Sequence, residues 1–322
     1  MPSILFDGRS IQLQEKESVL DALLRDGHAL PYSCKAGSCG TCMMRAVEGE
    51  LPAKSQFGLK DSWKEQRYFM PCSCHPETDL SVATLAADTQ VPARLIALDP
   101  LSANVTRVRL ACDAAFEFRP GQYLSLFRPD GLARSYSIAS LPEDGLIELH
   151  VRILPNGRMS GWLRDGAQAG DSVRLLGPSG DCFYVSGRED QPLLLIGTGT
   201  GLAPLYGILR DALQRGHRGP IRLFHGAVTV EGLYLVGELR NLASLHPQFV
   251  YTPAVLDAAG TGAGDILAGS IDQVVLQQIP DLTGWRAFIC GDPELVQKLR
   301  KKVFLAGAAS KDIHADAFLP AG

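Results

Sequence analysis

The sequence predicts a multidomain chain with three successive architectures: a small α+β domain, an antiparallel β-barrel, and an α/β domain with a parallel sheet. Three observations predict them. The N-terminal part places a hairpin signal, a helical pattern and a cysteine-rich loop in that order, the middle part has many short strands with regular turns, and the C-terminal part alternates strands with helices. We expect these domains at residues 1–87, 88–188 and 189–322.

Composition limits the class of protein. With 322 residues, 46% hydrophobic and 20% charged, the chain suits two or three folded domains. A net charge of -4 gives no basic surface of the kind that nucleic acid requires, so this partner class is excluded. The N-terminus lacks a signal-peptide pattern, no apolar run is long enough to span a membrane, and the cysteines form no disulfide framework. We therefore expect a cytoplasmic protein.

The first segment predicts a hairpin followed by a helix. An apolar run over residues 3–6 precedes Asp7-Gly8, which is typical of a type I′ turn. Apolar residues then recur at helical spacing over 19–24, and Gly27 stands where a helix C-cap glycine is expected. The cysteine loop follows directly.

Four cysteines indicate an iron–sulfur cluster. Cys34, Cys39 and Cys42 have the C-x4-C-x2-C spacing that holds a plant-type [2Fe–2S] cluster, and a distant Cys72 completes the set. The glycines between them allow a tight loop whose backbone N–H groups point at the sulfurs. A zinc site or a Rieske centre is disfavoured, because the cysteine and histidine spacings that these sites need are absent. Cys72 is favoured over Cys74 by its distance from Cys42, and that choice stays open at this point.

The middle part predicts a closed barrel. Residues 147–153 alternate apolar and polar side chains, as a half-buried strand does. Turn signals recur at 129–131, 143–145, 155–157 and 178–180.

Two short motifs stand out in this part. Arg134-x-Tyr136-Ser137 resembles the R-x-Y-S/T flavin motif of the ferredoxin reductase superfamily, and the resemblance implies that Arg134 binds phosphate oxygens, Tyr136 packs on the flavin and Ser137 places its hydroxyl near N5. An Arg and a Tyr on a strand are more often a surface charge and a packed ring. The turn over 157–160 opens a helix whose first N–H groups favour an anion. The alternative is a plain turn in which Ser160 caps the helix and nothing binds.

The C-terminal part predicts a nucleotide site at the end of a buried strand. The apolar run 192–196 suits a parallel strand covered on both faces, and the glycine-rich segment 197–204 then opens a helix. It is not a Rossmann fingerprint, because Leu202 stands where a glycine is needed and no acidic residue ends the next strand at 221–225.

Taken together, the motifs resemble those of the ferredoxin–NADP reductase superfamily. Residues 1–85 resemble the β-grasp fold of plant-type ferredoxins, R-x-Y-S resembles the flavin motif, and G-T-G-x-A-P and C-G-x-P resemble the nicotinamide motifs. Across nearly its whole length the chain is similar to the ferredoxin-type reductase components of bacterial multicomponent oxygenases. The resemblance implies a β-grasp [2Fe–2S] domain, an FAD-binding barrel and an NAD(P)-binding α/β domain.

The resemblance also implies site residues. For the flavin these are Arg134, Tyr136, Ser137, His150, Val151, Arg152, Gly157, Met159, Ser160 and Phe318. For the nicotinamide they are Gly197, Thr198, Gly199, Thr200, Gly201, Ala203, Pro204, Cys290, Gly291, Asp292 and Pro293. Ser137, near flavin N5, and Cys290, near nicotinamide C4, are the residues expected to be catalytic. Relatives often carry Glu at the position of Asp316, and here four residues follow Phe318; this departure from the family pattern counts against a proton-relay role for Asp316.

The implied function is electron transfer from NADH through FAD and the cluster to a terminal oxygenase or another one-electron protein acceptor. FAD is favoured over FMN, because relatives with an N-terminal cluster use FAD. NADH is favoured over NADPH, because Val228 stands where many relatives carry Arg and Glu231 is nearby. The alternatives are a reductase of this architecture that serves another acceptor, such as a deoxysugar dehydratase, and a non-enzymatic redox-sensing iron–sulfur protein.

Overall fold

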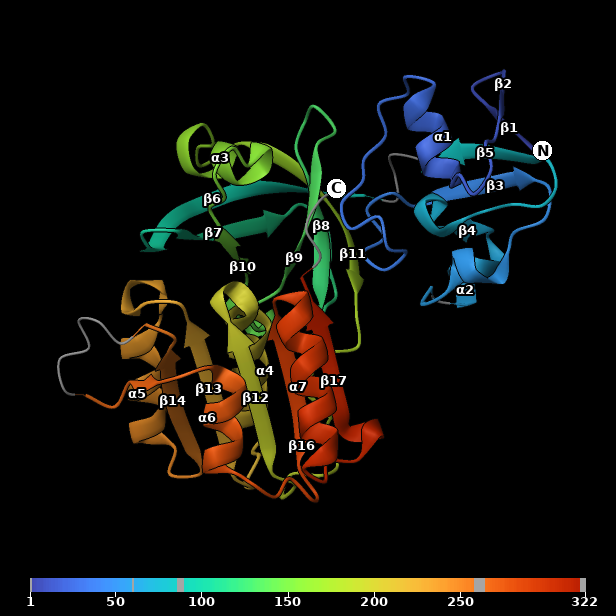
Figure 1. Ribbon diagram of the computed structural model, residues 1–322. Helices are drawn as coiled ribbons and strands as arrows, with labels where there is room; N and C mark the ends of the chain where they lie inside the picture. Colours follow the sequence, from blue (N-terminus) through green and yellow to red (C-terminus); the bar gives the residue numbers. More distant parts are fainter. Residues whose placement is uncertain (1, 60, 86–89, 258–263, 319–322) are drawn as a thin grey trace.

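The chain forms three lobes, each built around its own β-sheet (Figure 1). The computed structural model describes residues 2–59, 61–85, 90–257 and 264–318. In Figure 1 the N-terminal lobe is blue, the barrel lobe is mainly green, and the C-terminal lobe runs from yellow to red. None of the described helices is long and apolar enough to cross a membrane.

The N-terminal lobe is a mixed sheet covered by one helix. Its strands are β1 (Ser3–Phe6), β2 (Arg9–Gln12), β3 (Met44–Glu48), β4 (Tyr68–Phe69) and β5 (Leu80–Thr84), in the order β2-β1-β5-β3-β4. β1 and β2 form the predicted hairpin, and Asp7 and Gly8 both have the positive φ that a type I′ turn requires. Helix α1 (Val19–Arg25) has Ser18 as its N-cap, whose hydroxyl accepts the Asp21 N–H, and it buries Val19 and Leu23 against the sheet. Short helices η1 (Ala53–Gln56), α2 (Asp61–Glu65) and η2 (Pro71–Ser73) complete the lobe.

The middle lobe is a six-stranded antiparallel sheet. Its strands are β6 (Val91–Ser102), β7 (Val105–Cys112), β8 (Tyr123–Phe127), β9 (Ala133–Ser137), β10 (Ile147–Arg152) and β11 (Ser172–Ser179), in the order β10-β7-β6-β11-β8-β9. An antiparallel bridge between Ile138 and Leu149 joins the two edge strands, so the sheet closes into the expected barrel. Helix α3 (Arg158–Asp165) packs Met159 and Leu163 into the barrel core.

The C-terminal lobe is a parallel sheet. Its strands are β12 (Leu193–Thr198), β13 (Ile221–Ala227), β14 (Phe249–Val255), β15 (Leu267–Ala268), β16 (Arg286–Gly291) and β17 (Ile313–Ala317), in the order β15-β14-β13-β12-β16-β17. The helices are α4 (Leu202–Gln214), α5 (Val236–Leu245), α6 (Ile271–Gln278) and α7 (Pro293–Leu305), and two separate apolar cores lie on the two faces of the sheet.

The strand order of this lobe predicts where a ligand binds. The chain leaves β12 toward β13 and β14 on one side and returns to β16 and β17 on the other side. At such a switch point the carboxyl ends of the central strands open a crevice that binds ligands. The ends of β12 and β16 are therefore the place to look for a nucleotide site.

The barrel contacts both other lobes. On one side Met43 and Trp63 of the N-terminal lobe share an apolar cluster with Phe127 and Leu176 of the barrel. On the other side α4 lies so close that a Cβ on Gly207 would come within 3.1 Å of the Ala139 carbonyl oxygen.

Candidate functional site

The four predicted ligand cysteines lie together at the barrel side of the N-terminal lobe, in two pairs. The sulfurs of Cys42 and Cys72 lie 3.4 Å apart, and the Cys34 and Cys39 thiols are joined by a hydrogen bond. Within the described part of the chain, no three His, Cys, Asp or Glu side chains converge as a single metal ion would require. A two-iron cluster takes two ligands on each iron, which is the arrangement that two cysteine pairs offer.

The loop backbone turns its N–H groups toward these sulfurs. Gly37 N–H donates to Cys72 Sγ at 3.2 Å, and Ala36 N–H donates to Cys34 Sγ at 3.4 Å. Gly37 and Gly40 have positive φ, which permits the tight turn. A hydrogen bond from the Cys42 thiol, assisted by the one from Gly37, lowers the pKa of Cys72. Within each pair the hydrogen bond between the thiols lowers the pKa of one cysteine, Cys34 or Cys72, and raises the pKa of its partner, Cys39 or Cys42.

Cys74 lies in different surroundings. Its side chain is fully buried in the core of the lobe with Phe6, Leu23 and Phe69. Burial raises the pKa of this thiol to about 12. Of the two candidates for the fourth ligand, only Cys72 lies beside Cys42.

Strand β9 carries the R-x-Y-S motif and contacts both neighbouring lobes. Arg134 Nη1 donates to the carbonyl oxygen of Tyr32 in the N-terminal lobe at 3.2 Å. At the other end of the strand, Ser137 Oγ donates to Asp316 Oδ2 in the C-terminal lobe at 3.3 Å. Tyr136 is half-buried between them. One strand of five residues therefore joins the two outer lobes.

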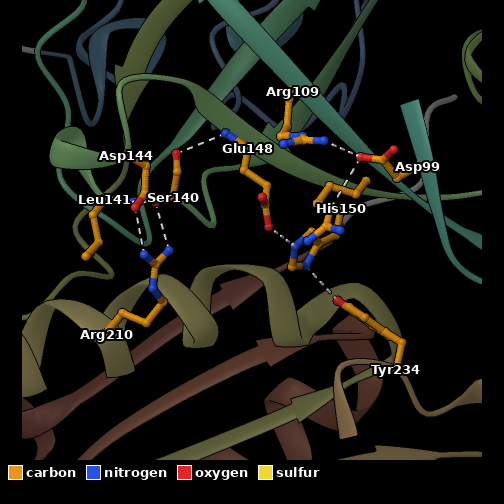
Figure 2. A network of polar contacts seen from close by, with 10 residues as sticks. Asp99, Arg109, Ser140, Leu141, Asp144, Glu148, His150, Arg210 and Tyr234 are labelled. Atoms are coloured by element: carbon orange, nitrogen blue, oxygen red, sulfur yellow. Dashed lines mark hydrogen bonds and ion pairs between the residues drawn. The ribbon is translucent and has the colours of Figure 1, made fainter. Parts of the chain in front are cut away.

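The side chain of His150 on β10 is engaged by protein groups (Figure 2). Nδ1 lies 3.1 Å from the Tyr234 hydroxyl, and Nε2 lies 2.9 Å from Glu148 Oε1. Burial lowers the pKa of His150 and outweighs the opposing effect of Glu148, so the ring is neutral, with Tyr234 donating to Nδ1 and Nε2–H donating to Glu148. Both ring nitrogens are occupied, so a flavin contact at this position would have to use the backbone. Next to it, Val151 is buried and Arg152 is exposed.

The turn before α3 leaves its backbone donors without a side-chain cap. Gly157 is the N-cap residue, and no side chain accepts from the first turn. The Ser160 hydroxyl accepts the Leu154 N–H at 3.2 Å instead of capping, and Met159 is buried in the barrel core. The alternative in which Ser160 caps the helix is therefore not what the structure shows. The backbone N–H groups of this turn are the donors for an anion.

The two nicotinamide motifs touch each other at the ends of β12 and β16. The segment comprises Gly197 and Thr198 at the end of β12, the turn η5 (Gly199–Gly201), and Ala203 and Pro204 in the first turn of α4. A Cβ on Gly201 would lie 2.2 Å from the Cys290 carbonyl oxygen, and one on Gly291 would lie 2.7 Å from Thr198 Oγ1. Glycine is therefore required at both positions for the backbones to approach. Asp292 accepts the Glu294 and Leu295 N–H groups and caps α7, in which Pro293 is the first residue.

Cys290 lies at the end of β16 beside an acidic residue. Its buried sulfur is 3.8 Å from that of Cys182, and burial raises the pKa of Cys290, which keeps the thiol neutral. Asp316 pairs with Cys290 across β16 and β17, and burial raises its pKa to about 6 against the opposing effect of Ser137. Phe318 follows at the end of β17, where its N–H donates to the Gly291 carbonyl oxygen at 2.8 Å. Ser137, Cys290 and Asp316 thus meet where the barrel faces the switch point.

The donor groups of the three lobes fit the three groups that the fold implies. Two pairs of thiols suit a two-iron cluster, uncapped helix starts at α3 and α4 suit pyrophosphates, and the glycine contact at Gly201 leaves the turn free of side-chain bulk.

Comparison with protein families defines the class. Residues 5–77 match the 2Fe-2S iron-sulfur cluster binding domain, residues 92–184 match the oxidoreductase FAD-binding domain, and residues 195–301 match the oxidoreductase NAD-binding domain. The chain is thus a flavin- and iron–sulfur-dependent NAD(P)H oxidoreductase.

Individual relatives narrow this to a family. The chain is 34% identical to the ferredoxin–NAD(P)+ reductase component of the naphthalene 1,2-dioxygenase system of Pseudomonas putida, over 98% of both chains. It is 32% identical to the aromatic O-demethylase reductase subunit of an Amycolatopsis species, over 98% of this chain and 97% of that one. The solved structure of the Amycolatopsis cytochrome P450 reductase GcoB has a TM-score of 0.72 and 31% identity over 100% of both chains. The chain belongs to the family of these flavin-dependent NAD(P)H reductases with an N-terminal plant-type [2Fe–2S] domain.

Proposed function

We propose that this protein takes electrons from NADH at the ends of β12 and β16 and delivers them singly from the cysteine loop to a terminal oxygenase. The observation that supports it most is the position of β9. This strand bonds to the cysteine-loop lobe through Arg134 and to the Cys290 region through Ser137. A flavin held along β9 would lie between the entry and exit sites. Bound FAD would supply the conversion between the two electrons of NADH and the single electrons that a cluster accepts.

The proposal assigns the barrel residues to flavin binding and positioning. Arg134 supplies donors for a phosphate, Tyr136 a ring face, and the first turn of α3 the N–H groups for pyrophosphate. Ser137 places its hydroxyl at the junction with Asp316 and Cys290, where the flavin and nicotinamide rings would meet.

The cysteine pairs are assigned one iron each. Cys34 and Cys39 hold one iron, and Cys42 and Cys72 hold the other, since these are the thiols that already lie in contact. The Gly37 and Ala36 N–H groups then remain as donors to the coordinating sulfurs.

At the nicotinamide site, the segment 197–204 and Cys290 hold the dinucleotide. We favour NADH, because the residue after β13 is Val228, whose side chain is 65% exposed and carries no charge for a 2′-phosphate. Glu231 in the next turn would oppose such a phosphate.

The proposed partner is an oxygenase, since the relatives serve naphthalene, phenol, terephthalate and propane oxygenase systems. The proposal places the protein in the cytoplasm, where its eight free cysteines would stay reduced.

The test separates electron entry from electron exit. Cys39→Ser should abolish the reduction of a one-electron protein acceptor, while NADH-dependent reduction of ferricyanide stays within about twofold of wild type. The matched variant Cys74→Ala should keep the cluster absorbance, whereas Cys72→Ser should lose it. Equal loss of both activities in Cys39→Ser protein that still holds its flavin would refute the division of roles.

A further inference from the structure

Three hydroxyl groups from two lobes meet next to a predicted cluster ligand. Thr41 Oγ1 of the cysteine loop lies 2.8 Å from Ser125 Oγ on β8 and 3.1 Å from Ser135 Oγ on β9. The two serines lie 3.3 Å apart and are opposite each other in the β8–β9 register. Thr41 and Ser125 are each only 1% exposed. No sequence motif pointed to this group, which we call the hydroxyl triad.

The triad contacts Cys39 in two ways. The Cys39 thiol lies 3.3 Å from Thr41 Oγ1 and donates to it, and Ser125 Oγ lies 3.5 Å from the Cys39 carbonyl oxygen. The same loop is bonded to the barrel once more by Tyr123, whose hydroxyl donates to the Ser38 carbonyl oxygen at 2.5 Å. These contacts near Cys39 fix the loop to β8 and β9 through uncharged groups, in addition to the bond from Arg134 to the Tyr32 carbonyl oxygen.

The hydrogen bond between Cys39 and Thr41 must reverse its direction when Cys39 binds iron. A coordinating cysteine is a thiolate, so its sulfur has no proton and can only accept hydrogen bonds. The Thr41 hydroxyl then has to donate to Cys39 Sγ. Its own oxygen is left to accept from Ser125 or Ser135, which are the hydroxyls within reach.

We propose that the hydroxyl triad becomes an oriented chain of hydrogen bonds that runs from the barrel strands through Thr41 to the Cys39 sulfur. This rests on the proposed function in one respect, namely that Cys39 is a cluster ligand. Each O–H dipole then has its positive end toward the cluster, and each bond in such a chain strengthens the next. Hydrogen bonds to the sulfurs tune the reduction potential, and positive dipole ends favour the more negative, reduced state.

The triad therefore has two roles. It holds the cysteine loop in register with the barrel strand that carries the flavin motif, and it raises the reduction potential of the cluster. Thr41, Ser125 and Ser135 are positioning residues, since none of them coordinates iron or contacts a substrate. The potential is the property that separates this role from a merely structural one.

The experiment is a redox titration of the cluster, followed by EPR in the intact, cofactor-loaded chain. Thr41→Val removes the hydroxyl and should lower the midpoint potential, by up to a tenfold change in the reduction equilibrium, which is 59 mV for a one-electron couple. Ser135→Ala should lower it less, because it removes only the support for Thr41. Thr41→Ser keeps the hydroxyl and should match wild type.

The possible outcomes distinguish a failure of the hydroxyl-triad proposal from a failure of the proposed function. A wild-type potential in both Thr41→Val and Ser135→Ala would overturn the proposal for the triad. If the wild-type protein itself bound no [2Fe–2S] cluster, the proposed function would fail instead. Should Thr41→Val lose its cluster on purification, Ser125→Ala and Ser135→Ala decide the question, because both changes lie in the barrel, outside the ligand loop.

Discussion

The two sides of the barrel that face the other lobes are held by different chemistry. Toward the N-terminal lobe the contacts around Cys39 are uncharged, with Thr41 meeting Ser125 at 2.8 Å and Tyr123 meeting a backbone carbonyl, and the Arg134 guanidinium donates to the Tyr32 carbonyl oxygen. Toward the C-terminal lobe the contacts include an ion pair between oppositely charged side chains (Figure 2). Arg210 on α4 makes hydrogen bonds of 2.7 and 2.8 Å to Asp144, and the buried His150 joins Glu148 to Tyr234.

The difference follows from what each side borders. Around Cys39 the barrel supplies hydroxyl dipoles, which can turn with the protonation state of the sulfur, whereas a fixed charge at that position would bias a centre whose own charge changes by one electron. On the other side, the ion pair between Arg210 of α4 and Asp144 is partly exposed to solvent, with side chains that are 26% and 32% exposed. Four predictions test this contrast, beginning with the largest expected effect.

Gly201→Ala should impair the reaction with NADH and leave the cluster unaffected. The new Cβ would lie 2.2 Å from the Cys290 carbonyl oxygen, so the segment 197–204 must move away from Cys290. A displacement of about 1 Å at a reacting centre can lower the rate about 10²-fold. We expect NADH-dependent reduction of ferricyanide to fall by that factor, measured as kcat/KM for NADH. The cluster absorbance should be unchanged.

The matched control is Gly237→Ala in α5, where an added Cβ meets no atom within 4 Å. It should leave both measurements at their wild-type values. Near-normal turnover in Gly201→Ala would show that the contact between the two motifs does not position the nicotinamide.

Lowering the pH should destabilise the side of the barrel that faces the C-terminal lobe, because buried neutral histidines lie there. Burial lowers the pKa of His150, and it lowers that of His225 to about 3, so both rings are neutral in the folded protein. Below the ordinary pKa of about 6.5 and above the lowered folded-state pKa of each ring, the unfolded chain binds more protons, so the free energy of unfolding falls as the pH drops below 6.5. Each such histidine contributes up to about 1.4 kcal/mol per pH unit. Asp316, whose pKa is raised to about 6, acts in the opposite direction as a single group.

The measurement is the thermal unfolding midpoint between pH 7 and pH 5, for wild type and for His225→Leu. Removing the buried imidazole should reduce the slope with pH, whereas His246→Gln, a change at the half-buried end of α5, should not. An unchanged slope in His225→Leu would contradict the assignment.

Val228→Arg should change which dinucleotide the nicotinamide side accepts. A cation at this exposed position after β13 can pair with a 2′-phosphate, as an Arg does in NADP-binding sites. We expect the ratio of kcat/KM for NADPH to that for NADH to rise about tenfold, which corresponds to about 1.4 kcal/mol. Val228→Leu is the size control. A wild-type ratio near or above one would refute the preference for NADH itself.

Local patterns in the sequence predicted much of the fold and part of the site. The spacing of Cys34, Cys39 and Cys42 indicated the cluster loop, and the apolar run before Gly197 indicated the buried strand of the parallel sheet, because both signals lie in short segments. The contacts between lobes could not be predicted in this way. Ser137 and Asp316 are 179 positions apart, and His150 and Tyr234 are 84 apart. A lone Ser, Asp or Tyr has no periodicity or spacing that would reveal such a partner.

The smallest expected effect is a salt-dependent change in unfolding temperature, which should differ between the two sides of the barrel. Asp144→Asn removes the charge that Arg210 pairs with but keeps an oxygen for the Leu141 N–H, which Asp144 accepts at 2.9 Å. Part-exposed ion pairs contribute less than about 1 kcal/mol, and 1 M salt reduces the Debye length to about 3 Å. We therefore expect the variant to unfold slightly earlier than wild type at low salt and at nearly the same temperature in 1 M salt. Ser135→Ala should show a difference from wild type that salt does not change, because hydroxyl hydrogen bonds carry no net charge. If salt altered both differences equally, the two sides of the barrel would not differ in the way the structure indicates.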